Sequence, residues 1–386
     1  MRSHVTLKGI SWDHGRAFPP IIAAAQRYEE THPGISISWE KHSLHKFGHA
    51  PVDSLCDNYD LLIIDHPWMG YAHRRRCFLP LKSHLSAREY LDLERHSVGD
   101  SFQTYHWAGE LWALPIDAAC PASFWRQDRL EPDEPLPARW SELLEWARQG
   151  RVIVPGFPPD LFLHFAMLCV TENPKCGESP DGFAPDELAL DSLGHLQELF
   201  SLLPKTVFDP NPIAVHEQLA SMQGTGPEYC PFAYVYSNYA RRDYGLHVLT
   251  FGDMPQAPGG KLLRSVIGGT GLAVSAKCKH PETALDFARF TASEPVQRTF
   301  YTHAGGQPAH VTAWTDPFNH QLTNGFFQAL LAPMQRAWTR PRFEHYPRIQ
   351  EEAGACLRDW LRDGGSSRSC LRGMNRIWKS YISVSS

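Results

Sequence analysis

Strand-like and helix-like patterns of apolar residues alternate along the first hundred positions. Residues 5–12 and the apolar run at 59–65 (YDLLIID) predict buried strands, the second buried on both faces as in a parallel sheet. Residues 18–31 place apolar side chains on one helical face behind two prolines, and residues 35–39 alternate as a strand does. This alternation predicts an α/β fold built on a mostly parallel sheet flanked by helices.

The same alternation continues along the rest of the chain, which is too long to form one compact core. With 386 residues, the chain is expected to form two domains. Pro115 is expected to end a short strand at residues 111–117, and a mostly helical tail is predicted from residue 326 onward. Further strands are predicted at 151–155 and 266–276, and further helices at 141–150, 161–170, 191–203 and 280–291.

Polar and aromatic residues follow the carboxyl ends of the predicted strands. In open parallel sheets, ligands bind beyond these ends. Carboxylates and imidazoles can exchange hydrogen bonds with hydroxyl groups, and indole faces stack on C–H surfaces, so we expect a polar pocket with aromatic walls. The residues at these ends are Trp12, Asp13, His14, Asp65, His66, Trp68 and Asp117.

The same strand ends allow a second interpretation as a metal-dependent hydrolase. Two carboxylates and two imidazoles, from Asp13, His14, Asp65 and His66, would satisfy zinc or iron. A second candidate set is His42, His45 and His49, although the chain has 20 histidines and chance clusters are expected. No HExxH, GxSxG, GxxxxGK[ST] or strand-linked GxGxxG motif occurs. We therefore predict a binding protein without catalytic residues, metal or cofactor, and keep the hydrolase as the alternative.

Charge and cysteine content argue against several other classes of protein. A formal net charge of −5 gives no attraction to nucleic acid or anionic membrane. The nine cysteines contain no CxxC spacing, which argues against zinc-ribbon or thioredoxin chemistry and mildly favours a reducing compartment. The N-terminal residues contain no secretory signal, and no apolar run approaches the ~18 residues that span a bilayer.

The order of several segments resembles family 1 extracellular solute-binding proteins of ABC importers, the group that includes maltose-binding protein. The most specific match is GGTGLAVSAKCKHPETALDFARFTASEPVQRTF at 268–300, followed by GGQP at 305–308. The other matching segments are RYEETHPGISISWE at 27–40, YDLLIID at 59–65, GELWALPID at 109–117, FWRQDRL at 124–130 and WSELLEWARQG at 140–150.

The resemblance implies a two-lobed type II periplasmic-binding-protein fold that is discontinuous in sequence. Residues 1–116 and 266–312 would form lobe 1, and residues 117–265 and 313–386 lobe 2. It further implies a monomer that binds a small polar solute, with a carbohydrate expected, in a cleft that closes by hinge motion before delivery to a membrane permease. A periplasmic location follows from the family, whereas the lack of a signal keeps a cytoplasmic solute sensor as an alternative.

The resemblance also assigns ligand contacts by position. It supports the strand-end residues named above and adds the glycine-rich segment of Gly268, Gly269, Thr270 and Gly271, where glycine lets the backbone approach a ligand or bend at a lobe crossing. Tyr234 and Tyr236 would face them from the second lobe. The family pattern before this aromatic segment is degraded at residues 219–222, so the resemblance does not identify the solute.

Overall fold

The computed structural model describes residues 4–43 and 52–385 and divides the chain into two compact units, each discontinuous in sequence. The chain passes from unit 1 to unit 2 after residue 119, returns after 266, and exchanges again between residues 331 and 348. Unit 1 comprises Met1–Ala119, Ile267–Leu331 and Arg342–Pro347, and unit 2 comprises Cys120–Val266, Ala332–Pro341 and Arg348–Ser386.

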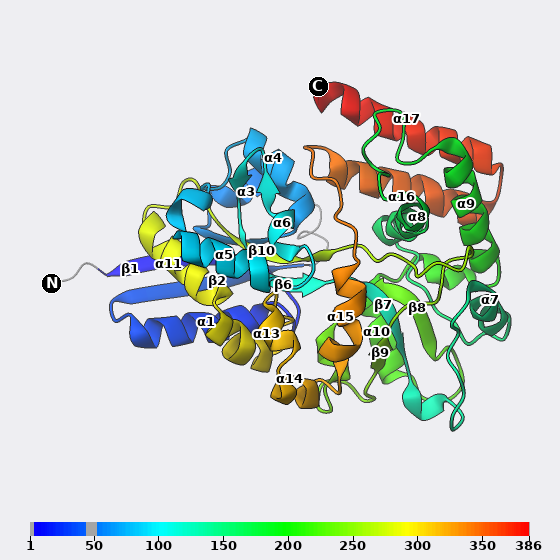
Figure 1. Ribbon diagram of the computed structural model, residues 1–386, viewed down its shortest axis with the longest axis horizontal. Helices are drawn as coiled ribbons and strands as arrows, with labels where there is room; N and C mark the ends of the chain where they lie inside the picture. Colours follow the sequence, from blue (N-terminus) through cyan, green and yellow to red (C-terminus); the bar gives the residue numbers. More distant parts are fainter. Residues whose placement is uncertain (1–3, 44–51, 386) are drawn as a thin grey trace. The chain divides into compact units, whose positions relative to one another are not determined.

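Unit 1 is built on a five-stranded mixed sheet with the order β2-β1-β3-β10-β6 (Figure 1). Strand β1 pairs in parallel with β2 and β3, while β10 is antiparallel to both β3 and β6. The carboxyl ends of β1, β3 and β6 therefore share one edge of the sheet with the amino end of β10, and we call it the carboxyl edge. The strands are β1 (Val5–Trp12), β2 (Ile35–His42), β3 (Leu61–Ile64), β6 (Leu114–Ala119) and β10 (Gly268–Val274).

Helices cover this sheet, with α11 packed on β10 and β6 and α1 packed on β2 and α11. A short hairpin precedes the amino end of β6 and consists of β4 (His106–Trp107) and β5 (Glu110–Leu111). The helices of unit 1 are α1 (Phe18–Thr31), α3 (Val52–Cys56), η1 (His66–Trp68), α4 (Met69–Arg74), η2 (Lys82–His84), α5 (Ala87–His96), α6 (Ser101–Thr104), α11 (Pro281–Ala292), α12 (Glu294–Val296), η6 (Gln297–Tyr301), α13 (Val311–Trp314) and α14 (Pro317–Leu322).

Unit 2 contains a smaller sheet of three antiparallel strands in the order β8-β7-β9, from β7 (Pro121–Trp125), β8 (Tyr229–Tyr234) and β9 (Thr250–Gly252). The apolar α8 lies in its core, and α17 packs against α9, with α16 beside α17 in Figure 1. Its helices are η3 (Gln127–Arg129), α7 (Trp140–Arg148), α8 (Pro158–Glu172), α9 (Asp186–Ser201), η4 (Lys205–Phe208), α10 (Pro212–Ser221), η5 (Ser237–Ala240), α16 (Tyr346–Asp363) and α17 (Ser367–Ser385), while α15 (Phe326–Gln335) extends across the Leu331 boundary.

Most of the predicted elements are confirmed. The helix expected at 18–31 is α1 with the same bounds, and the buried run at 59–65 contains β3. The predicted apolar helix at 161–170 lies within α8, and the helix at 280–291 is α11 shifted by one residue. Apolar periodicity located these elements because each one buries a continuous face.

Two predicted strand features are wrong. Pro115 does not end a strand but lies inside β6, where it pairs with Gly271 at a register shift. Proline is tolerated there because β6 is the last strand in the sheet order, so a missing N–H breaks no ladder on the outer side. Residues 151–155 form no strand, only a single parallel bridge between Val152 and Tyr229.

The expectation of a mostly parallel sheet in each lobe holds for β2, β1 and β3 of unit 1 but is wrong for unit 2. There the three strands are antiparallel. The predicted division between residues 312 and 313 lies within unit 1, whose second segment continues to Leu331.

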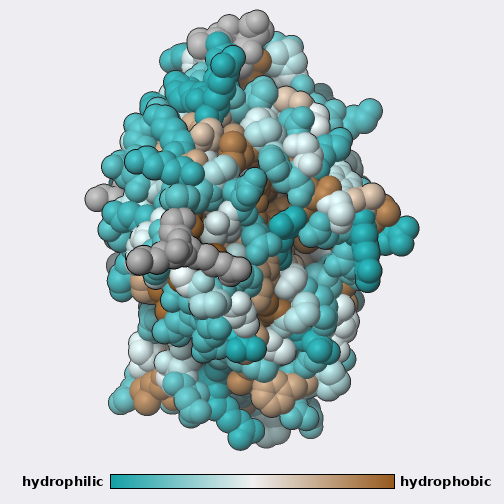
Figure 2. Space-filling view, turned by 90° about the vertical axis from the view of Figure 1, so that its left-hand side faces the viewer, coloured by the Kyte–Doolittle hydropathy of each residue, from teal (hydrophilic) through white to brown (hydrophobic). Residues whose placement is uncertain are grey.

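The surface is consistent with a protein that buries its apolar residues. Within residues 4–43 and 52–385, no helix combines the length and apolar character that a bilayer span requires. Figure 2 shows a face of unit 1 that is mostly hydrophilic, with apolar residues in small separate patches.

Candidate functional site

The carboxyl edge brings together the unit 1 residues predicted from strand ends. The register pairs Gly268 with Ala119 and Gly271 with Ile64, which places the glycine-rich start of β10 beside the ends of β6 and β3. The residues at this edge are Trp12, Asp13, His14, Asp65, His66, Trp68, Asp117, Gly268, Gly269, Thr270 and Gly271. Topology alone thus brings four distant chain segments together at one edge of the sheet.

A buried ion pair that the sequence did not reveal lies at the centre of this edge. The Arg16 guanidinium donates from Nε to Asp117 Oδ2 at 2.8 Å and from Nη2 to Oδ1 at 2.5 Å. The two side chains are only 5% and 2% exposed. This two-pronged geometry is the strongest way for arginine to hold a carboxylate, and it joins the loop after β1 to β6.

Several other groups surround the Asp117 carboxylate. Burial raises the pKa of Asp117, the Arg16 guanidinium opposes that rise, and the nearby Asp65 carboxylate adds to it. The backbone N–H of Thr270 also donates to Asp117 and favours its ionised form. Burial raises the pKa of the Tyr301 hydroxyl as well, and the Asp117 charge contributes. The centre of the carboxyl edge is therefore a compact network of one cation and two carboxylates.

Trp12, His14 and Arg16 form a short stack at the end of β1. The Trp12 and His14 rings lie 5.3 Å apart at 16°, and the Arg16 guanidinium lies 6.0 Å from the Trp12 ring. The Arg16 backbone N–H donates to His14 Nδ1 at 3.0 Å, so the neutral ring carries its hydrogen on Nε2. Burial and the Arg16 charge lower the pKa of His14 to about 4. His14 is thus a neutral imidazole at neutral pH.

The end of β3 contributes an acid and two aromatic rings. The Asp65 carboxylate accepts from the His66 backbone N–H at 2.8 Å and caps the 3-10 turn η1, which ends at Trp68. The Asp65 side chain remains 23% exposed, whereas His66 is buried. Trp68 meets Tyr71 edge-on at 5.3 Å. Asp65 is therefore a carboxylate held in place by the backbone and still reachable by solvent.

Packing within unit 1 explains the glycines at the start of β10. Gly269 has a φ of +119°, and a Cβ atom there would lie 2.2 Å from the Asp117 carbonyl oxygen. At Gly271 a Cβ atom would approach the Tyr105 ring to 2.7 Å. Both positions require glycine because β10 crosses β6 and Tyr105 closely, at the point where the ladder shifts register.

The two predicted tyrosines belong to unit 2. Tyr234 ends β8 and lies 5.9 Å from the guanidinium of Arg340, and Tyr236 meets the His216 ring edge-on at 5.4 Å. Tyr236 is buried and Tyr234 half-buried. Their predicted role as ligand contacts stays a prediction.

The two predicted groups of metal ligands differ from the group of possible metal ligands that the structure brings together. Among the described residues, Asp13, His14, Asp65 and His66 do not form a group with ligand atoms close enough to share an ion. Of the second set, His45 and His49 lie outside the described residues. Asp92, His96 and His310 of unit 1 do converge. No spacing pattern predicts this group, because His310 lies more than two hundred positions from the other two residues.

The described architecture has many counterparts among solved structures. Maltose-bound MalE3 of T. maritima has a TM-score of 0.80 at 16% identity, covering 98% of this chain and 100% of that one. A ribitol complex of an ABC transporter solute-binding protein from Agrobacterium radiobacter K84 has a TM-score of 0.80 at 17% identity, covering 98% and 99%. A tagatose-bound protein from Thermotoga lettingae TMO has the same TM-score and identity, covering 98% and 100%. The chain has the two-lobed fold of these solute-binding proteins.

A match between the sequence and a family model identifies the family. The model of the bacterial extracellular solute-binding protein family matches residues 23–318, most of the chain. The chain belongs to this family, which confirms the predicted class, an extracellular solute-binding protein. No curated protein sequence matches it. The family is one of substrate-binding proteins, which does not favour the hydrolase or the cytoplasmic sensor.

Proposed function

We propose that this protein is the solute-capture subunit of an ABC importer and that its ligand is a sugar or a sugar alcohol. The observation that carries the proposal is the carboxyl edge of unit 1, where indole rings, a reachable carboxylate and a neutral imidazole lie at adjacent strand ends. The contacts proposed there are Trp12, Asp13, His14, Asp65, His66, Trp68, Asp117 and the segment from Gly268 to Gly271, with Tyr234 and Tyr236 from unit 2.

The chemistry of this edge matches a polyhydroxylated ligand. A sugar hydroxyl both donates and accepts, and the edge offers Asp65 as an acceptor and the His14 Nε2–H as a donor. The C–H faces of a pyranose suit the flat apolar surfaces of Trp12 and Trp68. The buried Arg16–Asp117 pair fixes the loop that carries His14, so the donor is held in place before the ligand arrives.

The solved relatives support the same ligand class. Maltose, ribitol and tagatose are the bound molecules in the three structures compared above, and all three are small and rich in hydroxyl groups. Under this proposal, the protein acts as a monomer outside the cytoplasmic membrane, in the periplasm in a Gram-negative cell. The ligand stabilises a closed arrangement of the two lobes, that arrangement engages a membrane permease, and no bond in the ligand is broken.

A thermal-shift screen tests this function directly. A ligand that binds only the native protein stabilises it by about 2.7 kcal/mol at a hundredfold excess over Kd, which is several degrees in Tm. We expect at least one of maltose, maltotriose, ribitol and tagatose to raise the Tm and to be recovered unchanged afterwards. Stabilisation by amino acids or organic acids alone would contradict the proposed ligand class, and recovery of a cleaved sugar would contradict a binding role.

A further inference from the structure

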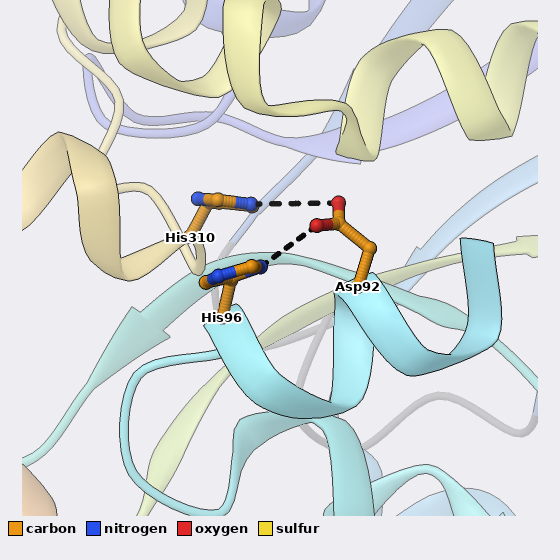
Figure 3. A group of neighbouring side chains, drawn as sticks. All are labelled: Asp92, His96 and His310. Carbon is orange, nitrogen blue, oxygen red and sulfur yellow. Dashed lines mark hydrogen bonds and ion pairs between the residues drawn. The ribbon is translucent and has the colours of Figure 1, made fainter. Parts of the chain in front are cut away.

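The strongest unexplained feature of unit 1 is a cluster of three side chains away from the carboxyl-edge residues. Asp92 and His96 lie one turn apart on α5, and His310 immediately precedes α13 (Figure 3). The His96 Nδ1 lies 2.7 Å from Asp92 Oδ1, and the His310 Nε2 lies 3.9 Å from Asp92 Oδ2. One ligand atom from each of the three side chains falls within 4.8 Å of the other two.

The buried histidine is the informative member of this cluster. His310 is 4% exposed, and its Nε2 atom is buried without a hydrogen bond although it points at the Asp92 carboxylate. Its other nitrogen, Nδ1, is 2.8 Å from the Thr312 hydroxyl. The Thr312 hydroxyl can accept from the Nδ1–H of His310, which leaves the Nε2 lone pair facing the Asp92 carboxylate, and a cation between them would then bind both groups.

The second imidazole is arranged in the same way. The His96 and His310 rings are stacked 5.4 Å apart at 23°, and each directs a nitrogen toward one oxygen of the same carboxylate (Figure 3). An aspartate and a histidine four residues apart on a helix present both ligands on one face. Asp92 and His96 are 49% and 44% exposed, so an ion can enter from solvent and these two side chains can adjust to it.

An ordinary helical ion pair does not account for this arrangement. Asp191 and His195 form the matched pair on α9, also four residues apart and with 3.5 Å between carboxylate and ring nitrogen. Among the residues that the structure describes, that pair is not joined by a third ligand, whereas Asp92 and His96 are. The Asp92 pair is thus distinguished by a buried imidazole supplied from a distant segment.

We propose that Asp92, His96 and His310 form a zinc site that is separate from the solute-binding residues. Two imidazole nitrogens and one carboxylate oxygen are a ligand set typical of Zn²⁺, with water completing the tetrahedron. Ligand atoms bound to one zinc ion are roughly 3.3 Å apart, so the widest separation in the cluster needs to contract by up to about 1.5 Å. The Thr312 hydroxyl supports the ring of His310 as an outer hydrogen-bond partner.

Zinc at this position would fasten α5 to the segment that leads into the carboxyl edge. Ser97, just after α5, bridges His310, and the neighbouring Val98 N–H donates to Ala309 O at 2.8 Å. Two residues further back, Gln307 O accepts from the Ala118 N–H at 2.9 Å, next to Asp117. The ion would therefore stabilise the segment that borders the buried ion pair.

The test uses the full chain after removal of metal with a chelator, titrated with zinc chloride in a calorimeter. We expect one equivalent of zinc to bind, and both His96→Gln and His310→Gln to weaken its affinity at least tenfold. The matched control His195→Gln should bind zinc as the unaltered chain does. Cobalt substituted for zinc should give the intense visible absorption of a tetrahedral site, and both variants should lose it.

Two outcomes would overturn the zinc site. One is the absence of a one-equivalent binding step in the unaltered chain. The other is unchanged affinity and stoichiometry in His96→Gln, which decides the matter even if the buried His310 variant fails to fold, because His96 is partly exposed. Circular dichroism of each variant in chelator establishes folding before titration. Sugar-induced thermal shifts in the same samples separate a failure of the zinc site from a failure of the solute-binding function.

Discussion

Each unit contains a buried arginine held by an aspartate, and the two pairs differ in a way that points to function. Arg16 of unit 1 reaches Asp117, which is 101 positions away and 2% exposed. Arg126 of unit 2 reaches Asp128, only two positions away and 52% exposed, and also donates to the carbonyl of Leu219. The first pair joins distant segments in a dry environment, and the second closes a local turn at the surface.

The pKa values of the two carboxyl groups move in opposite directions. Burial dominates at Asp117 and raises its pKa, whereas the hydrogen bonds from Arg126 dominate at Asp128 and lower its pKa. Keeping the Asp117 carboxylate charged therefore costs folding free energy, whereas keeping the Asp128 carboxylate charged does not. A costly buried charge beside a predicted ligand site indicates a positioning role for the Arg16–Asp117 pair.

The largest expected effect is on Asp117. Replacing Asp117 with Ala leaves the Arg16 guanidinium buried without its counter-charge, which costs about 3–5 kcal/mol of unfolding free energy. Chemical denaturation followed by circular dichroism measures the loss.

The double variant Arg16→Met with Asp117→Leu supplies the control for this interpretation. Removal of both charges should restore most of the stability, because apolar groups of similar size replace the pair without a desolvation cost. A double variant as unstable as Asp117→Ala would show that the cost comes from packing rather than from charge.

An intermediate effect is expected from acid. The pKa of His14 in the native state is about 4, below its usual 6.5, so the unfolded chain binds more protons. The stability contributed by neutral His14 is complete above pH 6.5 and is lost as the pH falls toward 4. His164 in the core of unit 2 also contributes stability that is lost in acid. The loss extends to lower pH, because burial lowers the pKa of His164 to about 3.

The variant His14→Gln isolates this contribution. Its loss of unfolding free energy between pH 7 and pH 4 should be smaller than that of the unaltered chain by about 2 kcal/mol. Denaturation midpoints at several pH values provide the measurement. Parallel pH curves for the two proteins would show that His14 does not remain neutral in the native state.

The smallest effect is expected at the surface pair of unit 2. Asp128→Ala removes an exposed carboxylate from Arg126, which keeps its carbonyl partners at Leu219 and Met222. The cost should be about 1 kcal/mol or less, and solute affinity should not change. A loss as large as that of Asp117→Ala would remove the distinction between the two pairs.

Much of the fold could be predicted because its signals are local. Residues 18–31 specify α1 through a proline pair and an apolar face, and the run at 59–65 specifies β3 because both of its faces are buried. The antiparallel sheet of unit 2 could not be predicted, since a short buried strand has the same composition in either orientation. The strand end predicted at Pro115 is wrong because a strand tolerates proline only at the edge of a sheet, and the sequence does not show which strand lies at the edge.

The candidate site was likewise predicted only in part. The strand ends at Trp12 and Asp65 were found because parallel topology gathers carboxyl ends at one edge. Arg16 was missed, since nothing in the sequence distinguishes a buried arginine from an exposed one four residues beyond a strand. His310 was missed for a related reason, because long-range convergence leaves no spacing pattern.

Calorimetric titration of the most stabilising sugar tests the central claim that the carboxyl edge of unit 1 binds the solute. Trp68→Ala should weaken binding by about 1–3 kcal/mol, and Asp65→Ala by a similar amount. The control Trp107→Ala, on the hairpin before the amino end of β6, should bind as the unaltered chain does. Undiminished affinity in both Trp68→Ala and Asp65→Ala would contradict the account.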